Sequence, residues 1–172
     1  MVWVMSLNIN MIKKYKIGLV IGRFQPFHLG HQFLIEQALK HAEKIIIGVG
    51  SSNIKDENNP YNVRQREEFI KSFLKEEELL DRVLNIVYIP DVPNDSEWYK
   101  IAHKLTGPVD VVIGDNSWVN GIYAAEKIPI IEIGMHKRHL LEGKRIRHNM
   151  KHKLSWKKRV PKYLQKLIEN SK

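Results

Sequence analysis

The sequence predicts an α/β protein with a doubly wound, Rossmann-like sheet of five parallel strands and a helical annex at the C-terminal end. Short apolar runs alternate five times with helical segments, and no long structureless gap interrupts them. The run at residues 44–50 is nearly continuous in apolar residues, which is typical of strands buried on both faces of a parallel sheet. After Gly134 the pattern changes to basic, sparsely apolar helices.

The elements follow one another in a regular order along the chain. Strands are expected at residues 16–21, 44–50, 83–89, 109–113 and 128–133. Helices are expected at residues 29–42, from 63 onward, and at 97–105, 118–126, 143–152 and 160–170. Asn62 is suited to cap the second helix, and Gln65 completes an approximate capping box. The polar segments 51–60 and 91–96 are expected to be loops.

Length and composition indicate one globular domain. We expect it to cover residues 15–172, with the annex at about 141–172 and an N-terminal extension at 1–14. Hydrophobic residues make up 43% of the 172 residues and charged residues 27%, which is typical of soluble proteins. The chain has no cysteine, which excludes disulfides, thiolate metal sites and cysteine nucleophiles. With no clear signal peptide and no apolar run of membrane length, we expect a cytoplasmic protein without a membrane partner.

The formal net charge of +9 has three interpretations. It can attract nucleic acid, attract small phosphorylated ligands, or simply keep the surface solvated. Much of the excess falls late in the sequence, at residues 137–138, 144–147 and 157–159.

The segment at residues 22–31, Gly-Arg-Phe-Gln-Pro-Phe-His-Leu-Gly-His, lies between the first strand and the first helix. In open α/β sheets such turns lie at the carboxyl ends of the strands, where ligands bind. His28 and His31 flank Gly30 at the opening of the helix, and free backbone N–H groups there favour phosphate. The alternative to phosphate binding is that one histidine only caps the helix and the other packs in the core. Two histidines around a glycine favour the phosphate-binding interpretation.

The segment at residues 22–31 resembles the signature of the HxGH nucleotidyltransferases, and more narrowly that of the archaeal nicotinamide-nucleotide adenylyltransferases. Later segments are similar as well: Gly50-Ser-Ser, Asn59-Pro-Tyr, residues 105–110, Gly114-Asp-Asn and Ile146-Arg147. Trp98 falls where the family has a tryptophan that stacks on nicotinamide, although packing into the core is the alternative for this residue and for Trp118.

The resemblance implies transfer of AMP from ATP to nicotinamide mononucleotide (NMN), giving NAD+ and pyrophosphate. It implies that His28, His31, Arg23 and Arg147 are catalytic. The implied ATP-binding residues are Gly22, Arg23, Phe24, His28, Gly30, His31, Gly114, Asn116 and Arg147. The implied NMN-binding residues are Ser51, Asn59, Pro60, Arg66 and Trp98. Mg²⁺ is expected to travel with ATP, without a metal site of the protein's own. A homo-oligomer without nucleic acid is expected.

Two departures from the family pattern leave alternatives open. Glu142-Gly143-Lys144 stands where the family has Ser-Gly-Thr, and Asn58 stands where the archaeal enzymes often have a basic residue. The first alternative is therefore adenylyl or cytidylyl transfer to another phosphate, such as phosphopantetheine or FMN. The second is a non-catalytic, basic nucleic-acid-binding domain. The choice between nicotinamide and nicotinate as the acceptor's ring is also open.

Overall fold

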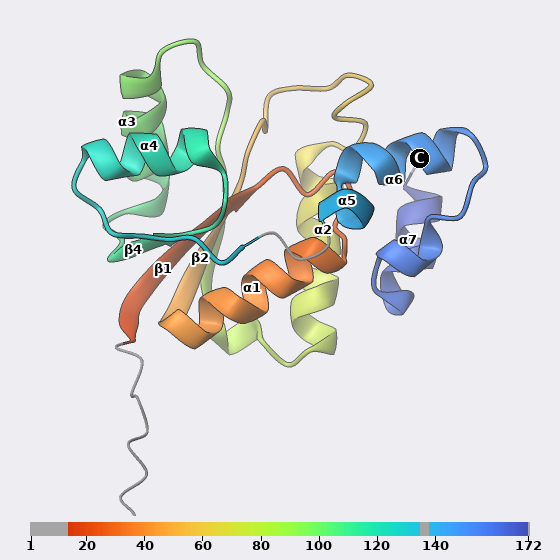
Figure 1. The fold of residues 1–172 in the computed structure, drawn as a ribbon, viewed down its shortest axis with the longest axis horizontal. Helices are drawn as coiled ribbons and strands as arrows, with labels where there is room; N and C mark the ends of the chain where they lie inside the picture. Colours follow the sequence, from red (N-terminus) through yellow and green to blue (C-terminus); the bar gives the residue numbers. More distant parts are fainter. Residues whose placement is uncertain (1–13, 135–137, 172) are drawn as a thin grey trace, which may run out of the picture.

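A computed structural model of the chain describes residues 14–134 and 138–171, so nearly all of the expected extension at 1–14 lies outside the described residues. The described sheet is parallel and has the strand order β3-β2-β1-β4-β5. Its strands are β1 (Tyr15–Gly22), β2 (Ala42–Val49), β3 (Val83–Tyr88), β4 (Val111–Ile113) and β5 (Ile130–Ile131). The chain winds from β1 outward to β3 and then returns to the other side of β1 (Figure 1). The predicted doubly wound fold is thereby confirmed.

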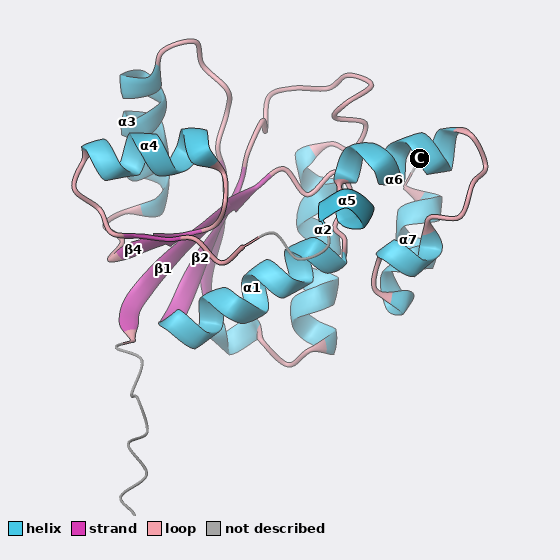
Figure 2. Cartoon of the chain, viewed as in Figure 1, coloured by secondary structure: helices cyan, strands magenta, loops and turns pink. Residues whose placement is uncertain are grey.

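Helices cover both faces of the sheet (Figures 1 and 2). One face carries α1 (Leu29–His41) and α2 (Val63–Glu76), and the other carries α3 (Asp95–Thr106) and α4 (Ser117–Ala125). Neighbouring strand residues alternate between the two cores, because successive side chains of a strand point to opposite faces. Val20 packs in the core under α1 and α2, whereas Leu19 packs in the core under α3 and α4.

The strands on the β4 side of the sheet are shorter than predicted. β5 ends at Ile131 rather than at residue 133, because the backbone N–H groups of Ile133 and Gly134 both donate to Asp115 Oδ1 at 3.0 Å. β4 begins at Val111 rather than at residue 109. Just before it, Asp110 accepts a hydrogen bond from the Ile17 N–H through its side chain, at 2.8 Å. A side chain thus takes the N–H groups that follow β5, whereas at the start of β4 the Asp110 side chain adds to a backbone bond from the Asp110 N–H to the Ile17 carbonyl.

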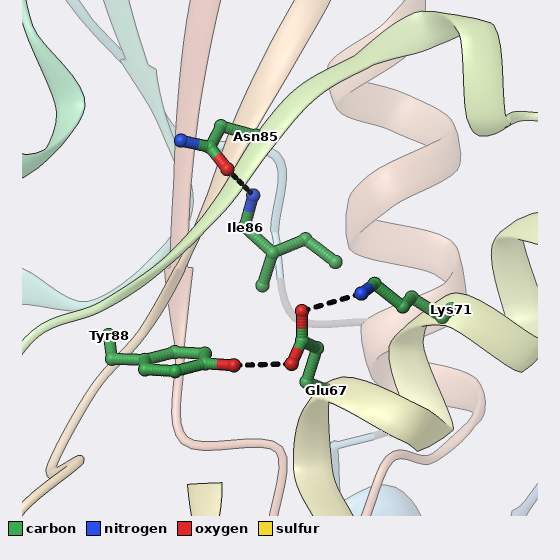
Figure 3. A network of polar contacts seen from close by, with 5 residues as sticks. All are labelled: Glu67, Lys71, Asn85, Ile86 and Tyr88. Atoms are coloured by element: carbon green, nitrogen blue, oxygen red, sulfur yellow. Dashed lines mark hydrogen bonds and ion pairs between the residues drawn. The ribbon is translucent and has the colours of Figure 1, made fainter. Parts of the chain in front are cut away.

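The cap predicted for α2 is present. The Asn62 side chain accepts from the Gln65 N–H at 3.0 Å, and the Gln65 side chain accepts from the Asn62 N–H at 2.9 Å. Further along α2, Glu67 forms an ion pair with Lys71 and accepts a hydrogen bond from the Tyr88 hydroxyl (Figure 3). This network ties the edge strand β3 to the helix that covers it.

The C-terminal annex packs on the α1 and α2 side of the sheet (Figure 1). It contains α5 (Arg138–Leu141), which was not predicted, and α6 (Gly143–Lys151), which was. The single helix predicted at 160–170 is wrong in its first half. Val160 and Pro161 are extended, a 3₁₀ turn η3 (Lys162–Leu164) follows, and α7 covers only Gln165–Asn170.

Six buried apolar side chains of the annex belong to the same core as the sheet. They are Ile146, Met150, Trp156, Val160, Leu164 and Ile168. The annex is therefore part of the fold rather than an appended arm. Across residues 14–134 and 138–171, the helices are all too short or too polar to cross a membrane.

Candidate active site

The turn between β1 and α1 places His28 and His31 at the start of the helix. His28 is the N-cap residue, and its Nδ1 accepts a hydrogen bond from the Gly30 N–H at 3.1 Å. His31 completes a capping box, since its Nδ1 accepts from the His28 N–H at 3.3 Å. The two rings stack with their centroids 3.7 Å apart. Both histidines also line a cavity, so capping and ligand binding are compatible roles.

The capping bonds determine which ring nitrogen carries the proton. A neutral imidazole has one donor nitrogen and one acceptor nitrogen. Because Nδ1 of each ring accepts a backbone N–H, the proton of the neutral form resides on Nε2. Each ring is therefore held as an Nε2–H donor at the cavity wall.

The surroundings keep both imidazoles neutral. Burial lowers the pKa of His28 to about 3, and the charge of Arg147 adds to the effect. Burial also lowers the pKa of His31 well below its usual value, with contributions from His28 and Arg23. At neutral pH the site therefore presents two uncharged donors beside the cationic Arg23 and Arg147. Neither imidazole has to change its protonation state for the site to bind an anionic ligand.

These lowered pKa values predict a specific acid dependence of stability. Below about pH 6.5 the unfolded histidines take up protons that the folded ones do not, so stability is complete above that pH and falls as the pH decreases. Each histidine contributes a slope of up to about 1.4 kcal/mol per pH unit. We expect His28→Asn to reduce the slope between pH 6.5 and 5 by roughly one such contribution. Urea unfolding at several pH values measures it, and equal slopes in both proteins would contradict it.

Gly30 is required by the histidine arrangement itself. A Cβ at this position would lie 2.9 Å from Cε1 and 3.0 Å from Nδ1 of His28, closer than atoms approach without a shift. The sequence suggested that Gly30 admits a ligand to the backbone. The structure shows a different reason for glycine at this position: a larger residue would collide with the ring of His28 that caps the helix.

A cavity of about 620 Å³ opens above this turn. It lies at the carboxyl ends of β1 and β4, where the strand order reverses, and ligands of open α/β sheets bind at this point. All nine residues predicted to bind ATP line it: Gly22, Arg23, Phe24, His28, Gly30, His31, Gly114, Asn116 and Arg147. Packing brings these residues together from three separate parts of the chain.

The annex forms one wall of the cavity. Arg147 on α6 donates from Nη1 to the Gln25 carbonyl at 2.7 Å, which fixes its guanidinium beside the turn. A Cβ on Gly143 would lie 3.0 Å from the same carbonyl, so glycine lets α6 approach this closely. Glu142 and Lys144, which replace the Ser and Thr of the family's Ser-Gly-Thr pattern, also line the cavity.

A second pocket, of about 330 Å³, adjoins the first. The two share Ile21, Gly22, Arg23 and Asn116 as lining residues. Ser51 and Trp98, both predicted to bind NMN, line this second pocket. Two of the five residues predicted to bind NMN therefore lie in a pocket next to the cavity that the predicted ATP residues line.

The other predicted NMN residues are not part of the wall of the second pocket. Arg66 is fully buried, and it donates from Nη1 to the carbonyls of Arg23 (2.9 Å) and Gly50 (2.7 Å). Its Nη2 donates to the carbonyl of Ser51 at 3.1 Å. Burial lowers its pKa to about 10, so it stays charged at neutral pH. Asn59 is buried; its Nδ2 donates to Asp56 Oδ1 at 3.0 Å, and its Oδ1 accepts from Arg23 Nη1 at 3.5 Å. Pro60 is exposed.

Sequence reasoning did not single out several residues of the site. Gln25 exchanges two hydrogen bonds with the Tyr61 backbone, at 2.8 and 3.0 Å, and so ties the turn to the 51–62 loop. Asp115 and Ser117 follow β4 and line the larger cavity. Asp91 lines the smaller one, as does Trp118, for which the sequence left ring stacking and core packing open. Asp115 was visible within the Gly114-Asp-Asn segment, but for Gln25 the only signal was its place inside the motif.

The described residues, 14–134 and 138–171, contain no group of three or more histidine and acidic side chains placed to hold a metal ion. The site instead consists of neutral imidazole donors, guanidinium groups and a helix N-terminus, all of which favour phosphate. Fold and site together thus define a nucleotide-binding α/β protein with its phosphate donors at the topological switch point.

Comparisons with known proteins place the chain within this class. The model of the cytidylyltransferase-like family matches residues 19–116. A nicotinamide-nucleotide adenylyltransferase of Methanothrix thermoacetophila is 30% identical over 90% of each chain. That of Methanosphaerula palustris is 33% identical over 82% of this chain and 83% of its own. The chain belongs to the cytidylyltransferase-like family, which confirms the resemblance that residues 22–31 carry.

A solved structure agrees with this assignment. The bifunctional NMN adenylyltransferase/ADP ribose pyrophosphatase of Francisella tularensis, complexed with AMP and a manganese ion, matches with a TM-score of 0.70 and 27% identity. The match covers 85% of this chain but only 44% of that longer protein.

Proposed function

We propose that this protein is an ATP-dependent nicotinamide-nucleotide adenylyltransferase. It transfers AMP from ATP to NMN and releases pyrophosphate. The observation that carries the proposal is the cavity in which all nine predicted ATP residues meet, with His28 and His31, each held in the Nε2–H form, among its lining residues. The adenylyltransferase relatives, which align over most of the chain, support the same activity.

The chemistry suits these side chains. A 5′-phosphate oxygen of NMN attacks the α-phosphorus of ATP, and the bond from that phosphorus to the bridging oxygen breaks. Pyrophosphate leaves with the electron pair. Because the nucleophile is already an anion, the reaction needs alignment and charge stabilisation more than a strong base. His28 and His31 donate to the triphosphate, and Arg23 and Arg147 offer fork-shaped donors to its oxygens.

The divalent ion is expected to arrive with the nucleotide. Mg²⁺ retains several waters and binds nucleotide phosphates readily, so it needs few protein ligands. The donor set of the cavity fits this arrangement, because its cations and N–H donors suit phosphate oxygens rather than a metal. When bound, Mg²⁺ supplies charge neutralisation across the phosphates.

The remaining parts of the proposal concern the acceptor and the organisation of the protein. Ser51, Asn59, Pro60, Arg66 and Trp98 are proposed to form or support the NMN half of the site. One catalytic domain is proposed from residue 15 onward, acting in the cytoplasm as a homo-oligomer without nucleic acid. The packing of the annex into the main core supports the single domain.

A pyrophosphate-release assay with ATP, Mg²⁺ and a panel of phosphate acceptors tests the function. We expect turnover with NMN, and comparison with nicotinate mononucleotide decides the preference for the ring. The second candidate, nucleotidyl transfer to another phosphate, is favoured by Glu142 and Lys144 in the cavity wall. This second candidate replaces the first if phosphopantetheine or FMN, as the acceptor, gives product with ATP or CTP as the nucleotide donor while NMN gives none. DNA or RNA binding without pyrophosphate release would support the nucleic-acid alternative.

Lys144 gives a further prediction at this wall. We expect Lys144→Ala to raise the KM for ATP by about fivefold, because an exposed ammonium beside a polyphosphate contributes a modest, screened attraction. Lys144→Thr restores the hydroxyl of the family pattern and is expected to recover part of the loss. Initial rates at low and high salt measure both effects. An unchanged KM at low salt would show that Lys144 does not meet the triphosphate.

A further inference from the structure

We propose that Asn53 is a positioning residue that fixes the spacing of two loops at the smaller pocket and thereby sets the affinity for the acceptor. The inference rests on the proposed function, since it takes this pocket as the acceptor's half of the site. Asn53 lies outside the wall of the pocket. It acts through the backbone of the two loops whose residues form part of that wall.

The two loops follow neighbouring strands. Residues 50–51, directly after β2, line the pocket, and so do residues 91–92, which come after β3. β2 and β3 pair as far as their last residues, and beyond them the ladder ends. The spacing of the two loops therefore depends on the hydrogen bonds that continue from one chain segment to the other past the end of the ladder.

Asn53 supplies two of these hydrogen bonds. Its Oδ1 accepts from the Asp91 N–H at 2.8 Å, and its Nδ2 donates to the Asp91 carbonyl at 3.0 Å. One side chain therefore pairs with both backbone groups of Asp91, as a neighbouring strand would. Closer to the ladder, the Ser52 N–H donates to the Ile89 carbonyl at 3.1 Å. The loops are thus joined twice, once through backbone groups and once through Asn53.

The loop after β3 has few backbone donors of its own. Pro90 and Pro93 lack an N–H, which leaves two backbone donors among residues 90–93. Asn53 binds the first of them, the N–H of Asp91. Each proline also restricts its own backbone and that of the residue before it, so the loop has few other conformations. Loss of the Asn53 amide should therefore let this loop shift as a unit rather than unfold.

The loop after β2 is held from two sides. Ser51 has a φ of 48°, in the left-handed region that a serine adopts only where surrounding contacts hold it. Arg66 donates to the Ser51 carbonyl from the buried side at 3.1 Å. Asn53 is exposed and binds Asp91 on the solvent side. Because solvent can replace exposed hydrogen bonds, we expect loss of Asn53 to cost little stability and to act mainly on the geometry of the pocket.

Looser loops should weaken binding of the acceptor without slowing the reaction of the bound complex. When the loops can separate in the unbound protein, only a fraction of the molecules presents the pocket in its binding form, and the apparent affinity falls by that fraction. The bound acceptor restores the spacing, so the rate at saturation changes little. The residues that line the larger cavity in the described structure include none from 50–53 or 89–93, so the affinity for ATP should not change.

Steady-state pyrophosphate release with varied NMN and varied ATP tests this role. We expect Asn53→Ala to raise the KM for NMN about fivefold, which corresponds to about one net hydrogen bond. The KM for ATP and kcat should change by less than about twofold. Asn53→Gln keeps the amide on a longer stem and should recover part of the loss. Asn53→Asp can accept from the Asp91 N–H but cannot donate to its carbonyl, so it should resemble Asn53→Ala.

Hydrogen exchange of the Asp91 amide gives a second readout that needs no turnover. In the unbound Asn53→Ala protein we expect this amide to exchange about tenfold faster than in the parent, because its acceptor is gone. Saturating NMN should restore part of the protection. Equal exchange rates in the parent and the variant would contradict the role of Asn53 in holding the loop.

Asn85→Ala is the matched control. Asn85 is also an exposed amide, but its Oδ1 accepts from the Ile86 N–H on β3, and it lines neither pocket (Figure 3). We expect this variant to leave both KM values and the exchange of the Asp91 amide unchanged.

The outcomes separate the inference from the proposed function. An unchanged KM for NMN in Asn53→Ala, or an equal rise for ATP and NMN, overturns the inference while the proposed function stands. If Asn53→Ala does not fold, the same comparison of KM values in Asn53→Asp decides. If the parent protein gives no product with NMN, the proposed function itself fails, and the inference fails with it.

Discussion

Replacing His28 with asparagine is expected to lower kcat by about a hundredfold or more while leaving the protein folded. Asparagine is among the best N-cap residues, so its side-chain oxygen can take over the capping bond that Nδ1 now accepts from Gly30. Its Nδ2–H2 group is also a donor, but it is bonded directly to Cγ and so stops short of the position that Nε2 occupies at the far side of the imidazole ring. The substitution therefore removes the interaction with the triphosphate and keeps the one that starts the helix. Steady-state rates together with thermal unfolding measure the two effects separately.

Alanine at position 28 tests the role of this side chain in capping the helix. His28→Ala should show the same loss of rate and, in addition, a loss of about 1 kcal/mol of stability, because the cap is removed as well. His31→Ala is likewise expected to cost about a hundredfold in kcat. His103→Asn, an exposed histidine on α3, serves as the control and should change neither quantity. A rate loss below about tenfold in His28→Asn or His31→Ala would contradict a role in transition-state stabilisation.

Replacing Arg66 with methionine is expected to destabilise the protein by about 3 kcal/mol or more. The guanidinium is fully buried, and its hydrogen bonds satisfy the carbonyls of Arg23, Gly50 and Ser51. These carbonyls belong to the turns after β1 and β2, and residues of the two turns line the two pockets. Buried acceptors that lose their donors cost free energy, and the two turns also lose the group that holds them together. Urea unfolding measures the change.

Two further variants make the Arg66 result specific. Arg64→Met lies on the same helix at an exposed position and is expected to change stability by less than about 0.5 kcal/mol. Arg66→Lys keeps the charge but loses the planar fork, so an intermediate loss is expected. If Arg66→Met instead keeps its stability and raises only the KM for NMN, the arginine contacts the acceptor directly, as the family resemblance implies.

The features best predicted from the sequence depend on nearby residues. The strand at 16–21, the histidine turn and the helix after it follow one another within 27 residues, and the structure has them in that order. The capping box of Asn62 and Gln65 spans a single turn of helix. Periodicity and caps act over four residues or fewer, so such elements are visible in the sequence itself. The local motif is also the reason why six of the nine residues predicted to bind ATP could be named from a single stretch, and all nine line one cavity.

Other features depended on contacts between distant parts of the chain. The helix predicted at 160–170 begins late because Val160 and Pro161 are extended where the annex packs into the core. Strand β5 ends early because Asp115, from the preceding turn, takes its next two N–H groups. The first effect also has a local signature, because the residue before a proline is driven into the extended region. The second has none, since it depends on a partner that the fold supplies.

The sequence by itself determined the fold class, the turn with its two histidines and the family, because these rest on a short motif and on regular alternation of apolar runs. Only the tertiary structure decided how individual side chains are used. It buried Trp98 and exposed Trp118, directed Arg66 to three backbone carbonyls, and brought Arg147 to Gln25 across 122 positions of the chain. Burial and long-range hydrogen bonds arise from the packing of whole elements, and no pattern within a few residues specifies them.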